Sequence, residues 1–181
     1  MKSEALIYVP SDTPEAMAMA TRKVAGVPLI IRGVMTLKQA GVKSLSLLIA
    51  SSQRGKIVRF LSRYNDSVLP EIEILEYEEH YGIGEELAGK IAGNASERLL
   101  LINSNLIFEK ELVHLFKETP MPQVGSIRCK AGAHSIPMYE VSSNAIEKLR
   151  KEVAARPRSI ETAIRIMLEG SDVAIVNKPA E

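Results

Sequence analysis

The sequence of 181 residues has an ordinary globular composition, with 46% hydrophobic and 25% charged residues. Its 23 basic and 22 acidic residues leave a net charge of +1, which argues against a nucleic-acid partner recognised by bulk charge. No apolar run approaches the roughly 20 residues of a membrane helix, and the lone Cys129 excludes an intramolecular disulfide. These features predict one domain over residues 1–181 in the cytoplasm, where thiols stay reduced.

Apolar runs and turn residues predict alternating strands and helices in the first two thirds of the chain. Pro28 suits the first position of a helix whose apolar residues recur every three or four positions, and Gly41 suits the left-handed residue that ends it. One or two helical turns are predicted within residues 14–23. The other expected strands are residues 5–9, 44–50, 71–76 and 98–103, and the other expected helices are residues 56–63, 85–92 and 109–117.

The sequence pattern in the last third of the chain predicts shorter elements. Strands are expected at residues 123–128, 135–140 and 172–176. Asn144 and Glu147 resemble a capping box for a helix that runs to about residue 155, and Ser159 suits the cap of a further helix.

The order of these elements predicts the fold class. Helices alternate with strands as far as residue 117, which is typical of an α/β protein. We expect a single-domain, mainly parallel Rossmann-like sheet flanked by helices. Ligands of such sheets bind at the carboxyl ends of the strands, so the loops at residues 10–14, 51–55, 78–84 and 104–105 should share one edge.

Residues 26–42 carry a family resemblance. They follow the pattern G-x-P-L-I-x-R-x-V-x-x-L-x-x-A-G-V almost position for position. The chain thereby resembles the nucleotidyltransferases of the nucleotide-diphospho-sugar transferase fold, and is most similar to inositol-phosphate and polyol-phosphate cytidylyltransferase domains. Such domains are often fused to a membrane CDP-alcohol phosphotransferase.

The resemblance implies a reaction and its requirements. It implies transfer of a nucleotidyl group from a nucleoside triphosphate, with CTP favoured, to a sugar or polyol phosphate. The chemistry needs a phosphate-binding loop, cations that offset the charge of the leaving pyrophosphate, and Mg²⁺ as cofactor. It implies no nucleic-acid partner.

The first loop departs from the family's glycine-rich pattern. Its nucleotide-binding candidates are Pro10, Ser11, Asp12 and Thr13, among which there is no glycine, and proline removes a backbone donor. The family's lysine falls near position 19, which holds a methionine. Arg22 and Lys23 follow closely and are the basic catalytic candidates. Alternatively, both are surface charges in solvent.

The segment after the strand at residues 98–103 departs in a second way. Relatives read L-x-x-x-G-D-x-[IV]-[FY] here, and their metal-binding aspartate becomes Asn105. An amide oxygen can ligate Mg²⁺ but adds no charge, so Asn105 is both the catalytic and the metal candidate. Alternatively, Asn105 only shapes the turn before the next helix.

Two further features complete the comparison with the family. Gly82 and Gly84 match the G-x-G segment that relatives place near the nucleobase, although glycines before a helix also occur without function. Relatives continue after the strand at residues 172–176 into a second metal aspartate and a closing helix. Either this sequence is a C-terminally truncated piece of a longer protein, which its apolar end favours, or the motif has been lost.

The departures leave three functional hypotheses. Loss of one charge-stabilising donor commonly costs about 3–4 kcal/mol, and several groups are replaced here, so any transfer should be slowed by several powers of ten. The first hypothesis is a nucleotidyltransferase-like domain with a divergent active site. The second is a non-catalytic nucleotide-binding or accessory domain that serves a fused CDP-alcohol phosphotransferase. The third is a resemblance of fold alone, with some other ligand bound at the same edge of the sheet.

Overall fold

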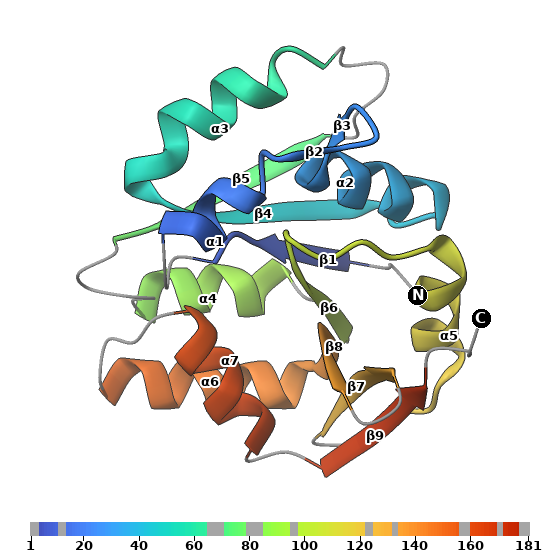
Figure 1. Cartoon of the computed structure of the whole chain (residues 1–181). Coiled ribbons are helices and arrows are strands. Elements are labelled where there is room, and N and C mark those ends of the chain that lie inside the picture. The colour runs from blue at the N-terminus through green and yellow to red at the C-terminus, as the bar shows by residue number, and fades with distance from the viewer. Residues whose placement is uncertain are drawn as a thin grey trace.

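A seven-stranded sheet in the order β5-β4-β1-β6-β8-β7-β9 organises the chain, and a separate two-stranded hairpin joins β2 to β3 (Figure 1). The computed structural model describes residues 4–10, 14–64, 71–78, 85–94, 98–121, 125–131, 134–155, 160–169 and 172–177. The strands are β1 Glu4–Tyr8, β2 Lys23–Val24, β3 Val27–Pro28, β4 Ser44–Ala50, β5 Ile72–Tyr77, β6 Arg98–Asn103, β7 Gly125–Ala131, β8 His134–Ser142 and β9 Asp172–Asn177.

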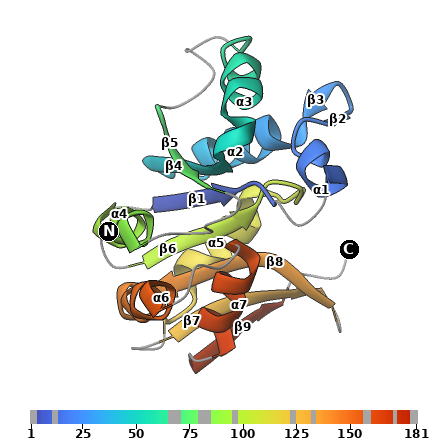
Figure 2. The same ribbon diagram turned by 90° about the vertical axis from the view of Figure 1, so that its left-hand side faces the viewer.

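Helices cover both faces of this sheet (Figures 1 and 2). One face packs against α2, α3 and α5, and the other packs against α4, α6 and α7. The helices are α1 Pro14–Met19, α2 Leu29–Gln39, α3 Arg54–Leu61, α4 Glu85–Asn94, α5 Lys110–Glu118, α6 Ser143–Ala155 and α7 Ile160–Glu169. Among the described residues, no helix combines the length and apolar character needed to cross a bilayer.

The predicted fold class is confirmed. Strands β1, β4, β5 and β6 are mutually parallel, and β7 is parallel to β9. Strand β8 runs antiparallel to both of its neighbours, β6 and β7. The sheet is therefore mainly parallel, with one reversed strand in its C-terminal part.

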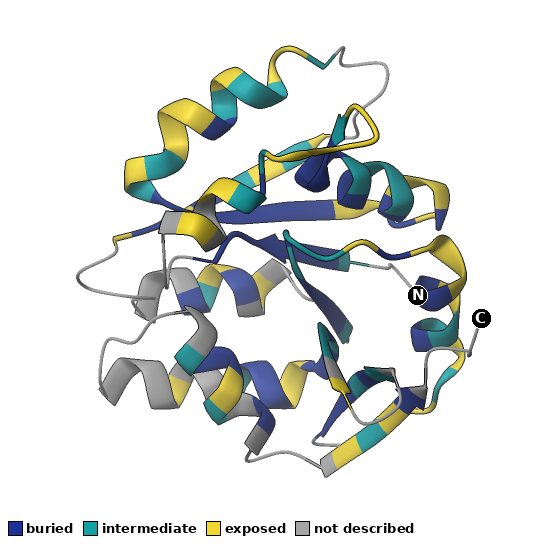
Figure 3. Ribbon diagram, in the orientation of Figure 1, coloured by how far each residue is buried: buried dark blue, intermediate teal, exposed yellow. Residues whose placement is uncertain are grey.

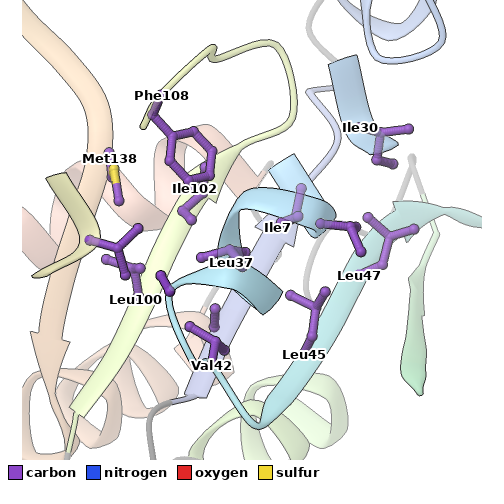
Figure 4. Packing of buried hydrophobic residues seen from close by; sticks show 14 of the residues in the cluster. Ile7, Ile30, Leu37, Val42, Leu45, Leu47, Leu100, Ile102, Phe108 and Met138 are labelled. Carbon is purple, nitrogen blue, oxygen red and sulfur yellow. The ribbon is translucent and has the colours of Figure 1, made fainter. Parts of the chain in front are cut away.

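Alternate residues of the central strands enter the two cores. On β1, Ile7 packs toward α2 and α5 while Leu6 and Tyr8 pack toward α4, α6 and α7. Figure 4 shows the first core, in which Ile7, Leu47 and Ile102 lie beneath α2. Figure 3 shows the same central strands as continuously buried, which is why their sequences are apolar without alternation.

Local geometry corrects two expectations and confirms one. Gly41 has φ +73 just after α2, as predicted. Pro28 is the N-cap of α2 rather than its first residue, because its ψ of 147 is extended. The cap of α6 is Ser142, whose Oγ accepts the Ala145 N–H at 3.3 Å, so the capping box predicted from Asn144 is wrong.

The β2–β3 hairpin is a feature that the sequence patterns did not predict. Its turn residues Ala25 and Gly26 have φ of 49 and 80, the positive pair of a type I′ turn. Turns of this type usually carry asparagine followed by glycine. Here the first position holds alanine, which tolerates a positive φ poorly, so the sequence lacks the usual signal of the turn.

Candidate functional site

The carboxyl ends of the parallel strands form the candidate site. From β1 the chain proceeds to β4 and β5 on one side, and then returns to place β6 on the other side of β1. The strand order therefore reverses between β1 and β6. Ligands of open α/β sheets bind in the crevice at such a switch point, because the loops that follow the two strands diverge there.

A backbone hydrogen bond joins the two strands at this point. The Ser104 N–H donates to the Tyr8 carbonyl at 2.9 Å and so extends the β1–β6 ladder into the loop that follows β6. Ser104 is only 3% exposed, so the first residue of this loop is packed inside the protein. The start of the loop after β6 is therefore fixed to the end of β1.

Asn105 follows Ser104 in a turn that is held by side chains. Its backbone N–H donates to Oδ1 of Asn103 at 2.9 Å, and its own Oδ1 accepts the Ser104 hydroxyl at 3.3 Å. The Leu106 N–H closes the turn on the Asn103 carbonyl at 3.1 Å. Asn105 is half-buried, and its amide oxygen already takes part in the turn.

The residues at this edge do not form a metal site by themselves. Within the part of the chain that the structure describes, no group of three or more histidine, cysteine, aspartate or glutamate side chains is placed to hold an ion. Asn105 offers one neutral oxygen, which is a weak ligand for a hard cation in the absence of carboxylates. The side chains that the structure describes at this edge therefore do not by themselves fit a resident Mg²⁺ ion.

The other predicted nucleotide-binding residues are only partly described. Pro10 follows β1, is buried, and carries no N–H for a phosphate. Its predicted companions Ser11, Asp12 and Thr13 lie outside the described residues. The same holds for Gly82 and Gly84 before α4.

The two basic candidates lie at the hairpin. Lys23 is exposed on β2, and Arg22 is exposed just before it, with Nη1 3.7 Å from Sδ of Met19. The Arg22 carbonyl accepts the Leu29 N–H at 3.1 Å, so both residues lie beside the start of α2. The structure places Pro10 and Asn105 after the paired ends of β1 and β6, and places Arg22 and Lys23 at the start of the β2–β3 hairpin.

Comparison with known proteins gives the fold a name. No protein-family model matches the sequence, and no curated protein matches it. Solved structures do match. The inositol-1-phosphate CTP transferase from T. maritima superposes with a TM-score of 0.67 at 11% identity, over 96% of this chain and 84% of that one. The chain has the fold of a nucleotidyltransferase.

Two further structures agree. A UDP-glucose pyrophosphorylase complexed with UDP-glucose matches with a TM-score of 0.67 at 11% identity, over 100% of this chain and 92% of that one. A protein from Mycobacterium tuberculosis H37Rv in complex with manganese matches with a TM-score of 0.69 at 10% identity, over 98% and 88%. This nucleotidyltransferase fold covers nearly the whole chain.

The structure adds Asn103 to the residues that the sequence analysis selected. Its Oδ1 accepts the Asn105 N–H, and Ser104 donates its hydroxyl to Asn105, so both hold the turn; Ile107 in the same loop is 57% exposed. The run Asn-Ser-Asn at 103–105 directly after a buried strand was the available signal, because such residues favour side-chain-closed turns. Ile107 gave no signal, since an apolar residue there also suits a core.

Proposed function

We propose that the chain binds a nucleoside triphosphate, with CTP as the first candidate, in the crevice between the ends of β1 and β6. The observation that supports this proposal is the switch point itself, where the buried Ser104 holds a turn that carries the half-buried amide side chain of Asn105. Nucleotidyl transfer to a sugar or polyol phosphate is the reaction that we propose for this site.

Each predicted residue has a place in this proposal. The loop from Pro10 to Thr13 bounds the phosphates, and the segment with Gly82 and Gly84 contacts the base. Arg22 and Lys23 offset the negative charge of the departing pyrophosphate. Asn105 orients a phosphate oxygen or a metal ion that arrives with the triphosphate. No nucleic acid takes part, and we place the protein in the cytoplasm.

A second function is favoured by a specific observation. The position of the family's carboxylate holds Asn105, whose amide oxygen accepts the Ser104 hydroxyl, and the described edge has no metal cluster. A site of this kind can bind a nucleotide without catalysing its reaction. In that case the domain is a nucleotide-binding or accessory unit, for which a fused CDP-alcohol phosphotransferase is the partner we propose.

Calorimetric titration separates these possibilities from a fold without nucleotide function. The protein is titrated with CTP, UTP, GTP and ATP, each with and without Mg²⁺, and pyrophosphate release is followed in the presence of polyol phosphates. Asn105→Ala should weaken binding, Asn105→Asp should strengthen its dependence on Mg²⁺, and the exposed His114→Gln on α5 should change neither. Binding with pyrophosphate release supports the transferase, and binding alone supports the second function. Absence of binding at millimolar triphosphate contradicts both.

A further inference from the structure

A basic pocket lies between the end of α1 and the outer side of α3, on residues that the proposed nucleotide site does not use. Its volume is about 390 Å³, and it is lined by Thr21, Lys56, Arg59, Phe60 and Arg63. Figure 2 shows α1 and the β2–β3 hairpin on one side of α3. Pockets for small molecules commonly measure about 300–1,000 Å³, so this one has room for a ligand.

The three cations of this pocket lie on α3 and in the turn that follows it. Lys56 and Arg59 are three residues apart on α3, and Arg63 lies just after the helix, where its N–H donates to the Phe60 carbonyl at 3.3 Å. All three are exposed, whereas Ile57 on the opposite side of the helix is 1% exposed and packs into the core. The core therefore fixes which side of α3 presents the charges.

These charges are not neutralised by the described part of the protein. No described acid pairs with Lys56, Arg59 or Arg63, whereas Arg54 on the same helix pairs with Glu76 at 2.6 Å. The sequence has no acidic residue from position 51 to position 64. Like charges three and four residues apart destabilise a helix, so an anion among them would remove an unfavourable interaction.

The side chains also have some order before any ligand arrives. Nε of Arg59 donates to the Gly55 carbonyl at 3.0 Å, which holds the guanidinium along the helix. Phe60 is half-buried, packs against the core and forms an apolar part of the pocket wall. The pocket thus combines three cations with one aromatic surface.

We propose that this pocket binds a small organic diphosphate, such as a nucleoside diphosphate. Three cations match the charge of two linked phosphate groups, and arginine binds phosphate oxygens in pairs. The ring of Phe60 suits the part of the ligand that carries no charge. Thr21 closes the far side of the pocket, and this concave shape favours a free molecule over the headgroups of a lipid surface. The inference does not rest on the proposed function.

The test compares variants of the intact chain by calorimetry with phosphate, pyrophosphate and ADP. We expect pyrophosphate and ADP to bind more tightly than phosphate, and added salt to weaken all three. Lys56→Gln, Arg59→Gln and Arg63→Gln should each weaken pyrophosphate binding by about three- to tenfold, and the triple variant should abolish it. Lys43→Gln, which removes an exposed charge before β4, is the matched control and should bind as the parent does.

Two further arms separate this pocket from the other possibilities. The triple variant should lose the same amount of pyrophosphate affinity in the parent and in an Asn105→Ala background, because Asn105 does not line this pocket. Sedimentation with vesicles containing phosphatidylserine tests a lipid surface. Equal binding by the triple variant and Lys43→Gln would overturn the proposal. So would absence of pyrophosphate and ADP binding at millimolar concentration, or binding to vesicles alone.

Discussion

Arg98 and Glu140 form a buried ion pair between neighbouring strands β6 and β8, with side chains that are 13% and 9% exposed. The same guanidinium donates through Nη2 to the carbonyls of Phe116 at 2.7 Å and Thr119 at 3.2 Å, at the end of α5. Arg98 therefore joins two strands and a helix terminus with one side chain.

Arg98→Met should destabilise the fold by about 3–5 kcal/mol, because it leaves Glu140 buried without its partner. Urea denaturation measures the free energy of unfolding. Adding Glu140→Gln to Arg98→Met should recover part of the loss, since a neutral amide is cheaper to bury than a carboxylate. A loss below about 1 kcal/mol for Arg98→Met would show that the pair contributes no more than an exposed ion pair does.

Stability should also depend on the protonation of Glu140. Burial raises the pKa of this carboxyl above its ordinary 4.5, although Arg98 and Lys117 oppose the change. Between 4.5 and the raised pKa, the folded state keeps a proton that the unfolded state has released. The contribution of protonated Glu140 to the free energy of unfolding is therefore fully present below pH 4.5. It is lost as the pH rises through that window.

Glu140→Gln removes this titration. We expect the parent protein to lose stability relative to the variant as the pH rises above 4.5, in unfolding experiments at a series of pH values. Parallel curves for the two proteins across the window would contradict the prediction.

One substitution should have opposite effects at two glycines. Gly41 has φ +73 after α2, a conformation that costs other residues about 1–2 kcal/mol, so Gly41→Ala should lower the free energy of unfolding by that amount. Gly93 lies within α4, and a Cβ there would meet nothing within 4 Å. Gly93→Ala should raise the free energy of unfolding by about 0.5–1 kcal/mol. Thermal unfolding of both variants checks the two signs.

Arg32 should control the order of the β2–β3 hairpin. Its Nε and Nη2 donate to the Val24 carbonyl at 3.0 and 2.7 Å and tie the hairpin to α2. Arg32→Lys cannot make both bonds, because lysine lacks the planar fork. We expect faster amide hydrogen exchange in residues 23–28 and unchanged exchange in β4. Unchanged exchange in the hairpin would show that its turn alone keeps it closed.

Sequence patterns predicted the elements whose signals are local. The strand β6 was predicted with both of its ends correct. A strand that is buried on both faces consists of a continuous run of apolar residues, and that run can be recognised in the sequence alone. The hairpin was missed, because Ala25 occupies a left-handed position that is held by contacts such as the Arg32–Val24 bonds. The cap of α6 was misplaced by two residues, since Ser142 also belongs to β8.

The site was less predictable than the fold. The edge that carries it followed from the strand order, but the bond between Asn105 and Ser104 depends on rotamers that no spacing reveals. The basic pocket had a signal that was not used. Lys56, Arg59 and Arg63 recur at helical spacing in an acid-free segment, yet only the fold shows that α1 ends opposite them.

The bracing of the sheet lies away from the crevice. Nζ of Lys117 donates to the Ala40 carbonyl at 2.7 Å, so the end of α2 is tied to α5, just as the end of α5 is tied to β6 by Arg98. None of these bonds involves Pro10, Ser104 or Asn105. The bonds that brace the sheet and the bonds that hold the Asn105 turn are therefore separate sets. The side chain at position 105 can change while these braces stay in place.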